Sequence, residues 1–281
     1  MGAESAMAAV VDVEDPADPR VGDFFALNDP ELRRRVEAPD GRGEGGFFVA
    51  EGALVIRQLL RSPYPVRSLL VTARALADLE ADLDELGVDA PVYRVDRAVM
   101  EAVAGFHFHR GALACAERLA PPSLDRVAGA ADLLLVAEGV NDNENLGALF
   151  RNAAAFGAGG VVVDRTSADP LYRRSVRVSM GQVLRLPFAR VPDAPDALRR
   201  LRALGFEVLA LTPDAGAEDV RQVPAARRRA LVVGAEGPGL TAAALVEATR
   251  RVRIPMAAGV DSLNVATAAA VALSYVARPR G

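Results

Sequence analysis

LVVGAEGPGL at residues 231–240 is the strongest indication of the fold of this chain, together with NLGALFRNAAAFGAGG at 145–160 and RIPMAAGVDSLNVATAAAVALSY at 253–275. Each stretch combines an apolar run typical of a buried strand with a turn of small or polar residues and a helix-like segment. An open α/β sheet presents its ligand crevice at such junctions. The three stretches therefore predict an α/β sheet with a ligand site beside its strand ends.

Strands and helices are expected to alternate from residue 131 to the C-terminus. Apolar runs predict strands that include 133–137, 161–163, 207–212 and 230–234. Helix-like segments lie between them, and a long apolar helix is expected at the C-terminal end. Such alternation predicts a mostly parallel sheet with helices on both faces.

The part of the chain before residue 131 is expected to contain a smaller α/β unit at 46–120. Its predicted strands are FFVA, VRSLLVTA and APVYRV, and LADLEADLDEL has the period of an amphipathic helix. A linker is expected at 121–130, because LAPPSLDRVAGA contains two consecutive prolines. The larger domain then comprises 131–281.

Residues 1–45 form a predicted acidic N-terminal extension with a helix at 29–37. Pro16, Pro19 and Pro30, and the glycine-rich GRGEGG at 41–46, argue against a continuous compact core there. The first residues lack a basic leader before their apolar patch, so no signal peptide is expected and the cytoplasm is the default location.

Charge is distributed unevenly along the chain. The net charge is −4, which is not typical of an RNA-binding protein. Residues 165–202, however, hold nine Arg and only three Asp, and such a basic strip can follow phosphates. The single cysteine, Cys115, lies in an apolar run and is interpreted as a buried strand residue rather than a nucleophile.

The glycines of GAEGPGL exclude two common nucleotide sites. Their spacing is G-x-x-G-x-G rather than the dinucleotide pattern, Glu236 stands where a phosphate would approach, and no Lys is present for a phosphate-binding loop. A nucleotide-dependent oxidoreductase is therefore disfavoured.

The three stretches resemble the SpoU/TrmH branch of the SPOUT RNA methyltransferases. The residues that carry the resemblance are Asn145, Gly147 and Arg151 in the first stretch, Gly234, Glu236, Gly237 and Gly239 in the second, and Ile254, Pro255, Met256, Ser262, Leu263 and Asn264 in the third. The resemblance implies a Rossmann-like parallel sheet whose C-terminal segment threads a loop to form a trefoil knot. It also implies a homodimer formed through the C-terminal domain.

The implied activity is methylation of a ribose 2′-hydroxyl in ribosomal or transfer RNA with S-adenosylmethionine, without a metal. The alternative is a non-catalytic RNA-binding or ribosome-assembly factor on the same scaffold. S-adenosylmethionine carries no phosphate, which agrees with the glycine pattern. The resemblance implies that its pocket is supplied by Leu211, Gly234, Ile254, Met256 and Leu263.

Arg151 is the main candidate for catalysis. The resemblance places it beside the ribose 2′-hydroxyl, as a base or as a group that stabilises the developing alkoxide. The second role is physically favoured, because arginine stays protonated in proteins. A purely structural pairing with Glu144 or Glu236 is the alternative.

Four further residues complete the predicted catalytic set. Asn145 and Asn264 are candidates to hold the loops and the ribose, and Glu236 to hold a loop or Arg151. Ser262 is expected to cap the last helix or, alternatively, to contact the target nucleotide.

Two groups of basic residues are candidates for RNA contact. Arg173, Arg174 and Arg177 lie in a stretch that resembles the family segment along which RNA passes, although a solvated helix face would look the same. The unit at 46–120 also resembles the family's RNA substrate-binding domain. In it, His109 and Arg110 follow His107 in GFHFHRG, where a strand would place both histidines on one face. A structural role for them is the alternative.

Overall fold

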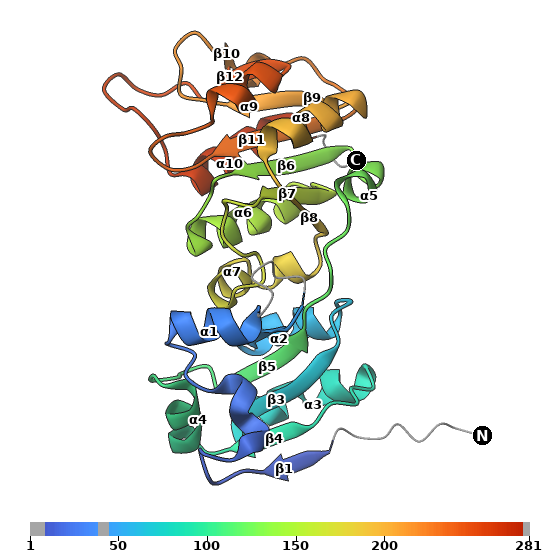
Figure 1. Ribbon diagram of the computed structural model, residues 1–281, viewed down its shortest axis with the longest axis vertical. Coiled ribbons are helices and arrows are strands. Elements are labelled where there is room, and N and C mark those ends of the chain that lie inside the picture. The colour runs from blue at the N-terminus through green and yellow to red at the C-terminus, as the bar shows by residue number, and fades with distance from the viewer. Residues whose placement is uncertain (1–8, 39–44, 278–281) are drawn as a thin grey trace, which may run out of the picture. The chain divides into compact units, whose positions relative to one another are not determined.

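The computed structural model describes residues 9–38 and 45–277, which form two compact units (Figure 1). The first unit contains the described residues up to Ala120 together with Leu171–Arg185, and the second contains the rest. Leu171–Arg185 thus packs with the first unit, whereas the sequence analysis assigned it to the domain at 131–281. The domain boundaries themselves stay a prediction.

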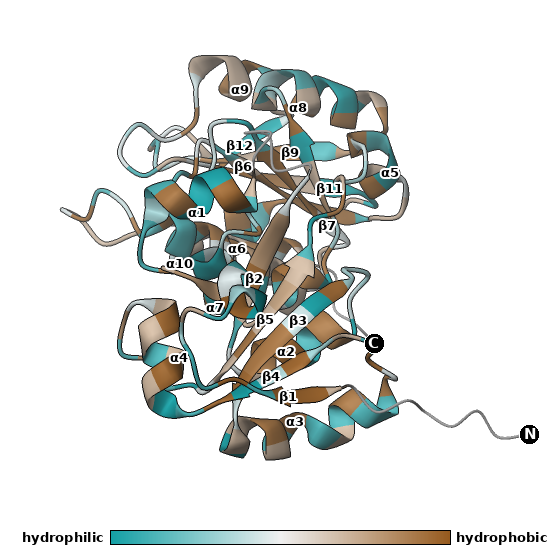
Figure 2. Cartoon of the chain, turned by 60° about the horizontal axis from the view of Figure 1, so that its bottom comes forward, coloured by the Kyte–Doolittle hydropathy of each residue, from teal (hydrophilic) through white to brown (hydrophobic). Residues whose placement is uncertain are grey.

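The first unit is built on a mixed five-stranded sheet of order β1-β4-β3-β5-β2. Its strands are β1 (Val10–Asp12), β2 (Phe47–Glu51), β3 (Val66–Thr72), β4 (Val92–Val95) and β5 (Ala112–Glu117). Strand β5 runs antiparallel to β2 and β3, and β1, β4 and β3 are parallel. In Figure 2 the brown part of β3 contains the buried residues Leu69, Leu70 and Val71, and the residues of β5 from Ala112 to Ala116 are likewise apolar and buried.

The described part of the first unit has five α-helices, three of which begin at a side chain that accepts a hydrogen bond from the first turn. They are α1 (Pro30–Glu37), α2 (Ala53–Leu60), α3 (Ala73–Glu85), α4 (Arg97–Ala104) and α7 (Arg173–Val178), with short 3-10 helices at Pro19–Phe24 and Gln182–Leu184. Asp29, Thr72 and Asp96 cap α1, α3 and α4 in this way.

The N-terminal segment has a core, so the expectation that it would lack one is wrong for its described part. Val21 and Phe24 are fully buried and join the cluster that includes Met100. Pro19 and Pro30 begin helices, where the missing N–H of proline has no cost. The predicted helix at 29–37 is confirmed as α1. Most of GRGEGG and residues 1–8 lie outside the described residues.

The second unit is an all-parallel seven-stranded sheet of order β10-β12-β9-β11-β6-β7-β8. Its strands are β6 (Leu133–Glu138), β7 (Gly160–Asp164), β8 (Phe188–Val191), β9 (Glu207–Leu211), β10 (Glu218–Asp219), β11 (Arg229–Gly234) and β12 (Arg250–Arg253), and the 3-10 helix Val220–Gln222 follows β10. Strand β11 lies between β6 and β9, so the strand order reverses there. Ligands bind at such a reversal in open parallel sheets.

Helices cover both faces of this sheet, as predicted. Helices α5 (Leu124–Gly129), α8 (Ala194–Ala203) and α9 (Ala242–Glu247) share one apolar cluster with alternate strand residues such as Leu134 and Val136. Helices α6 (Asn143–Ala155) and α10 (Val265–Val276) pack against each other, and α10 also packs on β11. The predicted α/β class is confirmed, and the trefoil knot stays a prediction.

The predicted linker at 121–130 contains helix α5. Ser123 caps it, and Val127 and Ala128 are buried in the core of the second unit. The two prolines therefore precede a short helix instead of marking an extended connection. Within the described residues, no helix has the length and apolar character required to cross a membrane.

Candidate functional site

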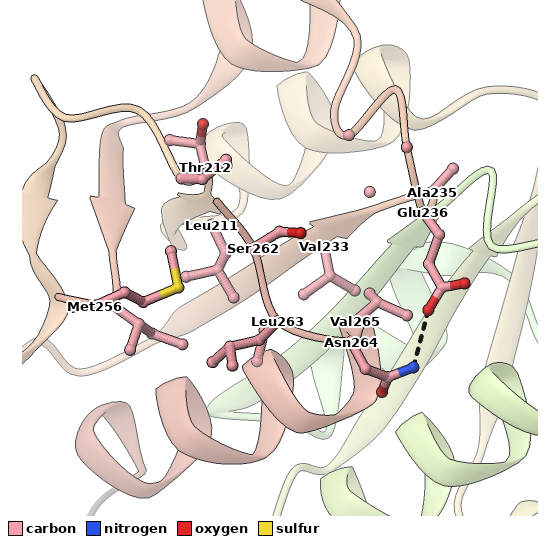
Figure 3. A pocket seen from close by; sticks show the side chains of 16 residues that line it. Leu211, Thr212, Val233, Ala235, Glu236, Met256, Ser262, Leu263, Asn264 and Val265 are labelled. Atoms are coloured by element: carbon pink, nitrogen blue, oxygen red, sulfur yellow. Dashed lines mark hydrogen bonds between the residues drawn. The ribbon is translucent and has the colours of Figure 1, made fainter. Parts of the chain in front are cut away.

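A pocket of about 340 Å³ lies where β9, β11 and β12 end and α10 begins (Figure 3). These ends are neighbours because the strands are parallel and adjacent in the sheet. All five residues predicted for the cofactor line the pocket: Leu211, Gly234, Ile254, Met256 and Leu263. Other lining residues that the sequence analysis did not single out for a site include Thr212, Pro213, Val233, Ala235, Val265 and Ala268.

Gly234 is required by the turn that closes one side of the pocket. A Cβ at this position would lie 2.3 Å from the carbonyl carbon of Gly239 and 2.4 Å from the nitrogen of Leu240. The loop therefore folds back onto the end of β11, and Gly239 N–H donates to the oxygen of Ala235 at 3.0 Å. Gly239 has a φ of +70°, a conformation that favours glycine.

Three side chains meet at the rim of the pocket and form the Asn145–Asn264–Glu236 bridge. The Asn264 amide nitrogen donates to Asn145 Oδ1 at 2.8 Å and to Glu236 Oε1 at 2.8 Å. Figure 3 shows the second of these bonds. Asn145 belongs to α6, Glu236 follows β11, and Asn264 precedes α10. The structure thus brings together three of the five predicted catalytic residues.

The orientation of the Asn264 amide is fixed by the helix that it caps. Its Oδ1 accepts from the backbone N–H groups of Ala266 at 3.0 Å and Thr267 at 3.2 Å. Backbone N–H groups only donate, so the oxygen must face α10 and the NH₂ group must face the bridge. Both amide hydrogens are then used, one for each bridge partner.

Ser262 does not cap the last helix, which corrects one of the two roles expected for it. The cap is Asn264, two residues later, and Ser262 is an exposed loop residue that lines the pocket. Serine and asparagine are both favourable caps, so composition alone could not distinguish the two positions. Contact with the target nucleotide stays a prediction for Ser262.

Arg151 is exposed on α6 and is absent from the pocket lining. Its side chain makes no hydrogen bond or ion pair with the described residues, so the structural pairing with Glu144 or Glu236 is not present. Its neighbour Asn152 donates to the oxygen of Ala266 at 2.8 Å, which turns that face of α6 toward α10. Successive helix residues point about 100° apart, so the Arg151 side chain does not lie on the face of α6 that contacts α10.

Glu138, which sequence reasoning missed, holds the residue that follows the pocket loop 235–240. It ends β6 opposite Gly234 and is buried, and its two carboxylate oxygens accept from Thr241 N–H at 2.9 Å and Thr241 Oγ1 at 2.8 Å. Thr241 caps α9 directly after the pocket loop 235–240. The only signal in the sequence was an acidic residue that ends an apolar run.

The predicted RNA contacts lie in the first unit. Arg173, Arg177 and Arg110 gather around Glu51, and Arg174 is exposed on α7. His109 lies in the loop at 105–111, not on a strand as expected. Glycines with positive φ at both ends of this loop interrupt the extended chain.

The histidines of this loop have separate partners. Arg97 Nη2 donates to His109 Nδ1 at 3.2 Å, which leaves the proton of the neutral ring on Nε2, while His107 contacts Glu101 at 3.1 Å. Within the described residues, no three His, Cys, Asp or Glu side chains are grouped closely enough to hold a metal ion. Cys115 is fully buried in β5, and this burial raises the pKa of its thiol.

Comparison with known proteins gives consistent matches. The model of the SpoU rRNA Methylase family matches residues 132–274. A Mycobacterium bovis protein named as an uncharacterized tRNA/rRNA methyltransferase is 50% identical over 266 residues, which cover 94% of this chain and 90% of that protein. The 23S rRNA (guanosine-2′-O-)-methyltransferase RlmB of Bordetella pertussis is 32% identical over 233 residues, which cover 80% of this chain and 94% of RlmB.

Solved structures agree with these matches. The crystal structure of an rRNA methyltransferase from Sinorhizobium meliloti with bound S-adenosylmethionine has a TM-score of 0.77 and 27% identity, and the match covers 94% of this chain and 96% of that one. The family match includes all three motif stretches up to residue 274 and the pocket that they form. The chain belongs to the SpoU rRNA methylase family.

Proposed function

We propose that this protein transfers the methyl group of S-adenosylmethionine to a ribose 2′-hydroxyl of ribosomal or transfer RNA. Family membership makes it an RNA methyltransferase that uses this cofactor. The observation that carries the finer proposal is the pocket whose rim is closed by the Asn145–Asn264–Glu236 bridge. The 2′-hydroxyl is the acceptor named for RlmB of Bordetella pertussis.

The residues of the pocket suit S-adenosylmethionine. Its wall is largely apolar, with Leu211, Ile254, Met256 and Leu263 available to pack against the adenine and ribose. Among the described residues that line it, Glu236 alone is charged, and its carboxylate would repel a phosphate and attract a sulfonium. When bound, the cofactor supplies an electrophilic methyl group; the chain holds it and excludes other ligands.

Arg151 is proposed to stabilise the negative charge that develops on the 2′-oxygen. A guanidinium with no partner among the described residues is available for this. A guanidinium donates hydrogen bonds in a fixed planar fork and stays protonated in proteins. It is therefore better suited to stabilise the negative charge on the 2′-oxygen than to remove the proton of the hydroxyl.

We propose that two copies of the chain share their active sites through the C-terminal domain. Two observations support this: Arg151 does not line the pocket of its own chain, and apolar side chains near α10 are exposed. Val260, Leu263 and Tyr275 are 49%, 39% and 53% exposed. Light scattering should give twice the chain mass.

Heterodimers test the shared site directly. Neither an Arg151→Ala homodimer nor a Gly234→Ala homodimer should be active. A mixture should regain activity, since one of the two sites combines a normal pocket with a normal arginine from the partner. A mixture that stays inactive although heterodimers form would refute sharing.

The first unit is proposed to bind the RNA substrate, and the second to carry the reaction. We also place the protein in the cytoplasm, where ribosomal and transfer RNA are found. Mapping of 2′-O-methyl sites in total RNA from a deletion strain and its parent tests the activity: one or more sites should disappear and return on complementation. If no site changes and purified protein binds RNA without methyl transfer, the non-catalytic factor would be favoured.

A further inference from the structure

Glu51 is a buried carboxylate that three arginines surround. It ends β2 and its side chain is 5% exposed. Arg173 Nη1 lies 2.5 Å from its Oε2, while Arg110 Nε and Arg177 Nη1 each lie 3.6 Å from its Oε1. All four residues belong to the first unit. One negative charge is thus shared by three positive charges, which leaves a local excess of two.

Arg173 is a structural anchor rather than a free contact for RNA. It donates to the oxygen of Leu27 at 3.3 Å, and its guanidinium lies 5.2 Å from the ring centre of Phe106. With its short bond to Glu51, these contacts leave the side chain only 17% exposed. Arg173 therefore ties α7 to the β2 end and the 105–111 loop.

Arg110 and Arg177 have unused hydrogen-bond capacity. Their side chains are 49% and 31% exposed. A separation of 3.6 Å exceeds a hydrogen bond, and neither guanidinium makes one with the described residues. Each guanidinium has five N–H donors in a planar fork that matches phosphate geometry. Because both lie against one carboxylate oxygen, the oxygens of a single anion can reach both.

The backbone holds Arg110 in this place. Gly52 follows Glu51 with a φ of +93°, and a Cβ there would lie 3.2 Å from Arg110 Cδ. The side chain of Arg110 thus crosses directly over the backbone of Gly52, where no other residue would leave the same room. The Glu51 carboxylate lies against both guanidinium groups and restricts their motion, which reduces the entropy lost when they bind a ligand.

We infer that Arg110 and Arg177 form a two-arginine site for one backbone phosphate of the substrate RNA, with Glu51 and Arg173 as its positioning residues. The inference rests on the proposed function, because the anion is identified as RNA phosphate through the activity of the family. Of the five predicted RNA contacts, Arg173 becomes a structural anchor and Arg110 and Arg177 become phosphate ligands, while Arg174 and His109 are given no role in this site.

Salt dependence of RNA binding tests this site. The full-length double variant Arg110→Gln, Arg177→Gln is titrated with a fluorescein-labelled RNA stem-loop at several salt concentrations. The slope of log affinity against log salt should become shallower by about 0.7–0.9, as for one lost phosphate contact. The variant Arg74→Gln, Arg126→Gln is the control, because it removes the same charge from two exposed arginines outside the cluster.

Two results would overturn the inference: a slope equal to that of the wild type, or an equal loss in the control variant. Affinity for S-adenosylmethionine, measured by calorimetry, should be normal in both variants, which also verifies their folding. Failure of the proposed function would look different. The wild type would then bind RNA and transfer no methyl group, while the slope would still report on the two arginines.

Discussion

The change Asn264→Asp separates the two tasks of this side chain. A carboxylate at this position accepts from the N–H groups of Ala266 and Thr267 as the amide does, so the cap on α10 is retained. It cannot donate to Asn145 or Glu236, so both 2.8 Å bridge bonds are lost. Because the bridge joins loops at the pocket rim, its loss should leave the core and the α10 cap stable and let these loops open, so that cofactor binding has to close them at a free-energy cost.

The expected loss can be worked from these contacts. Two hydrogen bonds are worth about 1 kcal/mol each, and two carboxylates at this separation repel by about 1 kcal/mol in a largely aqueous setting. Asn264 and Glu236 are exposed, so solvent screens part of this sum. A net loss of about 2 kcal/mol corresponds to a Kd for S-adenosylmethionine that is roughly 30-fold higher.

Calorimetry with S-adenosylmethionine and thermal unfolding without it measure the two tasks separately. Asn264→Ala is the matched comparison, because it should lower stability by about 1 kcal/mol through loss of the cap as well as weaken binding. Normal affinity in Asn264→Asp at neutral pH would refute the role of the bridge.

Three further changes have definite expected outcomes. Gly234→Ala should abolish binding of S-adenosylmethionine in calorimetry, because its Cβ would lie 2.3 Å from the Gly239 backbone; binding within a few-fold of wild type would contradict the proposed pocket. Arg151→Ala should lower methyl transfer about 100-fold or more and leave cofactor Kd unchanged, and near-normal turnover would show that the residue is not catalytic. Glu138→Ala should lower the melting temperature and raise the KM for S-adenosylmethionine, because Thr241 loses two bonds, each worth about 1–3 kcal/mol when a charged or buried partner is lost. In Glu138→Gln the KM for S-adenosylmethionine should return most of the way to the wild-type value. An equal rise of the KM in Glu138→Ala and Glu138→Gln would contradict the positioning role of Glu138.

Hydrophobic periodicity predicted several strands of the second unit and its alternation of strands and helices, but not helix α5. A strand was expected at 133–137 with a helix-like segment after it, and the structure has β6 at Leu133–Glu138 and α6 at Asn143–Ala155. The helix begins at Asn143 because Asp142 caps it and accepts from Asn145 N–H at 2.8 Å. Such a cap depends on backbone geometry, which an apolar pattern does not report.

The N-terminal segment was harder to predict because its core residues are few and separated by prolines. Val21 and Phe24 are buried against residues such as Met100, which lie far along the chain. A short segment shows no hydrophobic periodicity of its own when the residues that pack against it lie far away in the sequence. The burial of these residues depends on the assembled unit. In the sequence, a proline is as compatible with the first turn of a helix as with the end of a helix or strand.

Motif positions predicted the pocket residues well and their connections poorly. The five residues that the resemblance implies for the cofactor all line a single cavity, and their contact with the cofactor stays a prediction. The link from Glu138 to Thr241 and the shared contacts of Glu51 were not visible, because each joins residues of different elements that lie far apart in the chain. A family resemblance identifies which residue type stands at each site position. It does not identify the residues whose hydrogen bonds and ion pairs hold those side chains in place.

Asparagine at 264 illustrates why the type of residue is nevertheless informative. Serine, aspartate and asparagine all serve as helix caps, so the needs of α10 alone leave the choice open. Among these three, only asparagine combines an accepting oxygen with two donor hydrogens on the same planar group. Asn145 and Glu236 both present oxygens to it, 119 and 28 positions away in the chain. The contacts at the pocket therefore determine that the cap of α10 is asparagine. The helix loses no stability by this, because asparagine caps it as well as serine or aspartate would.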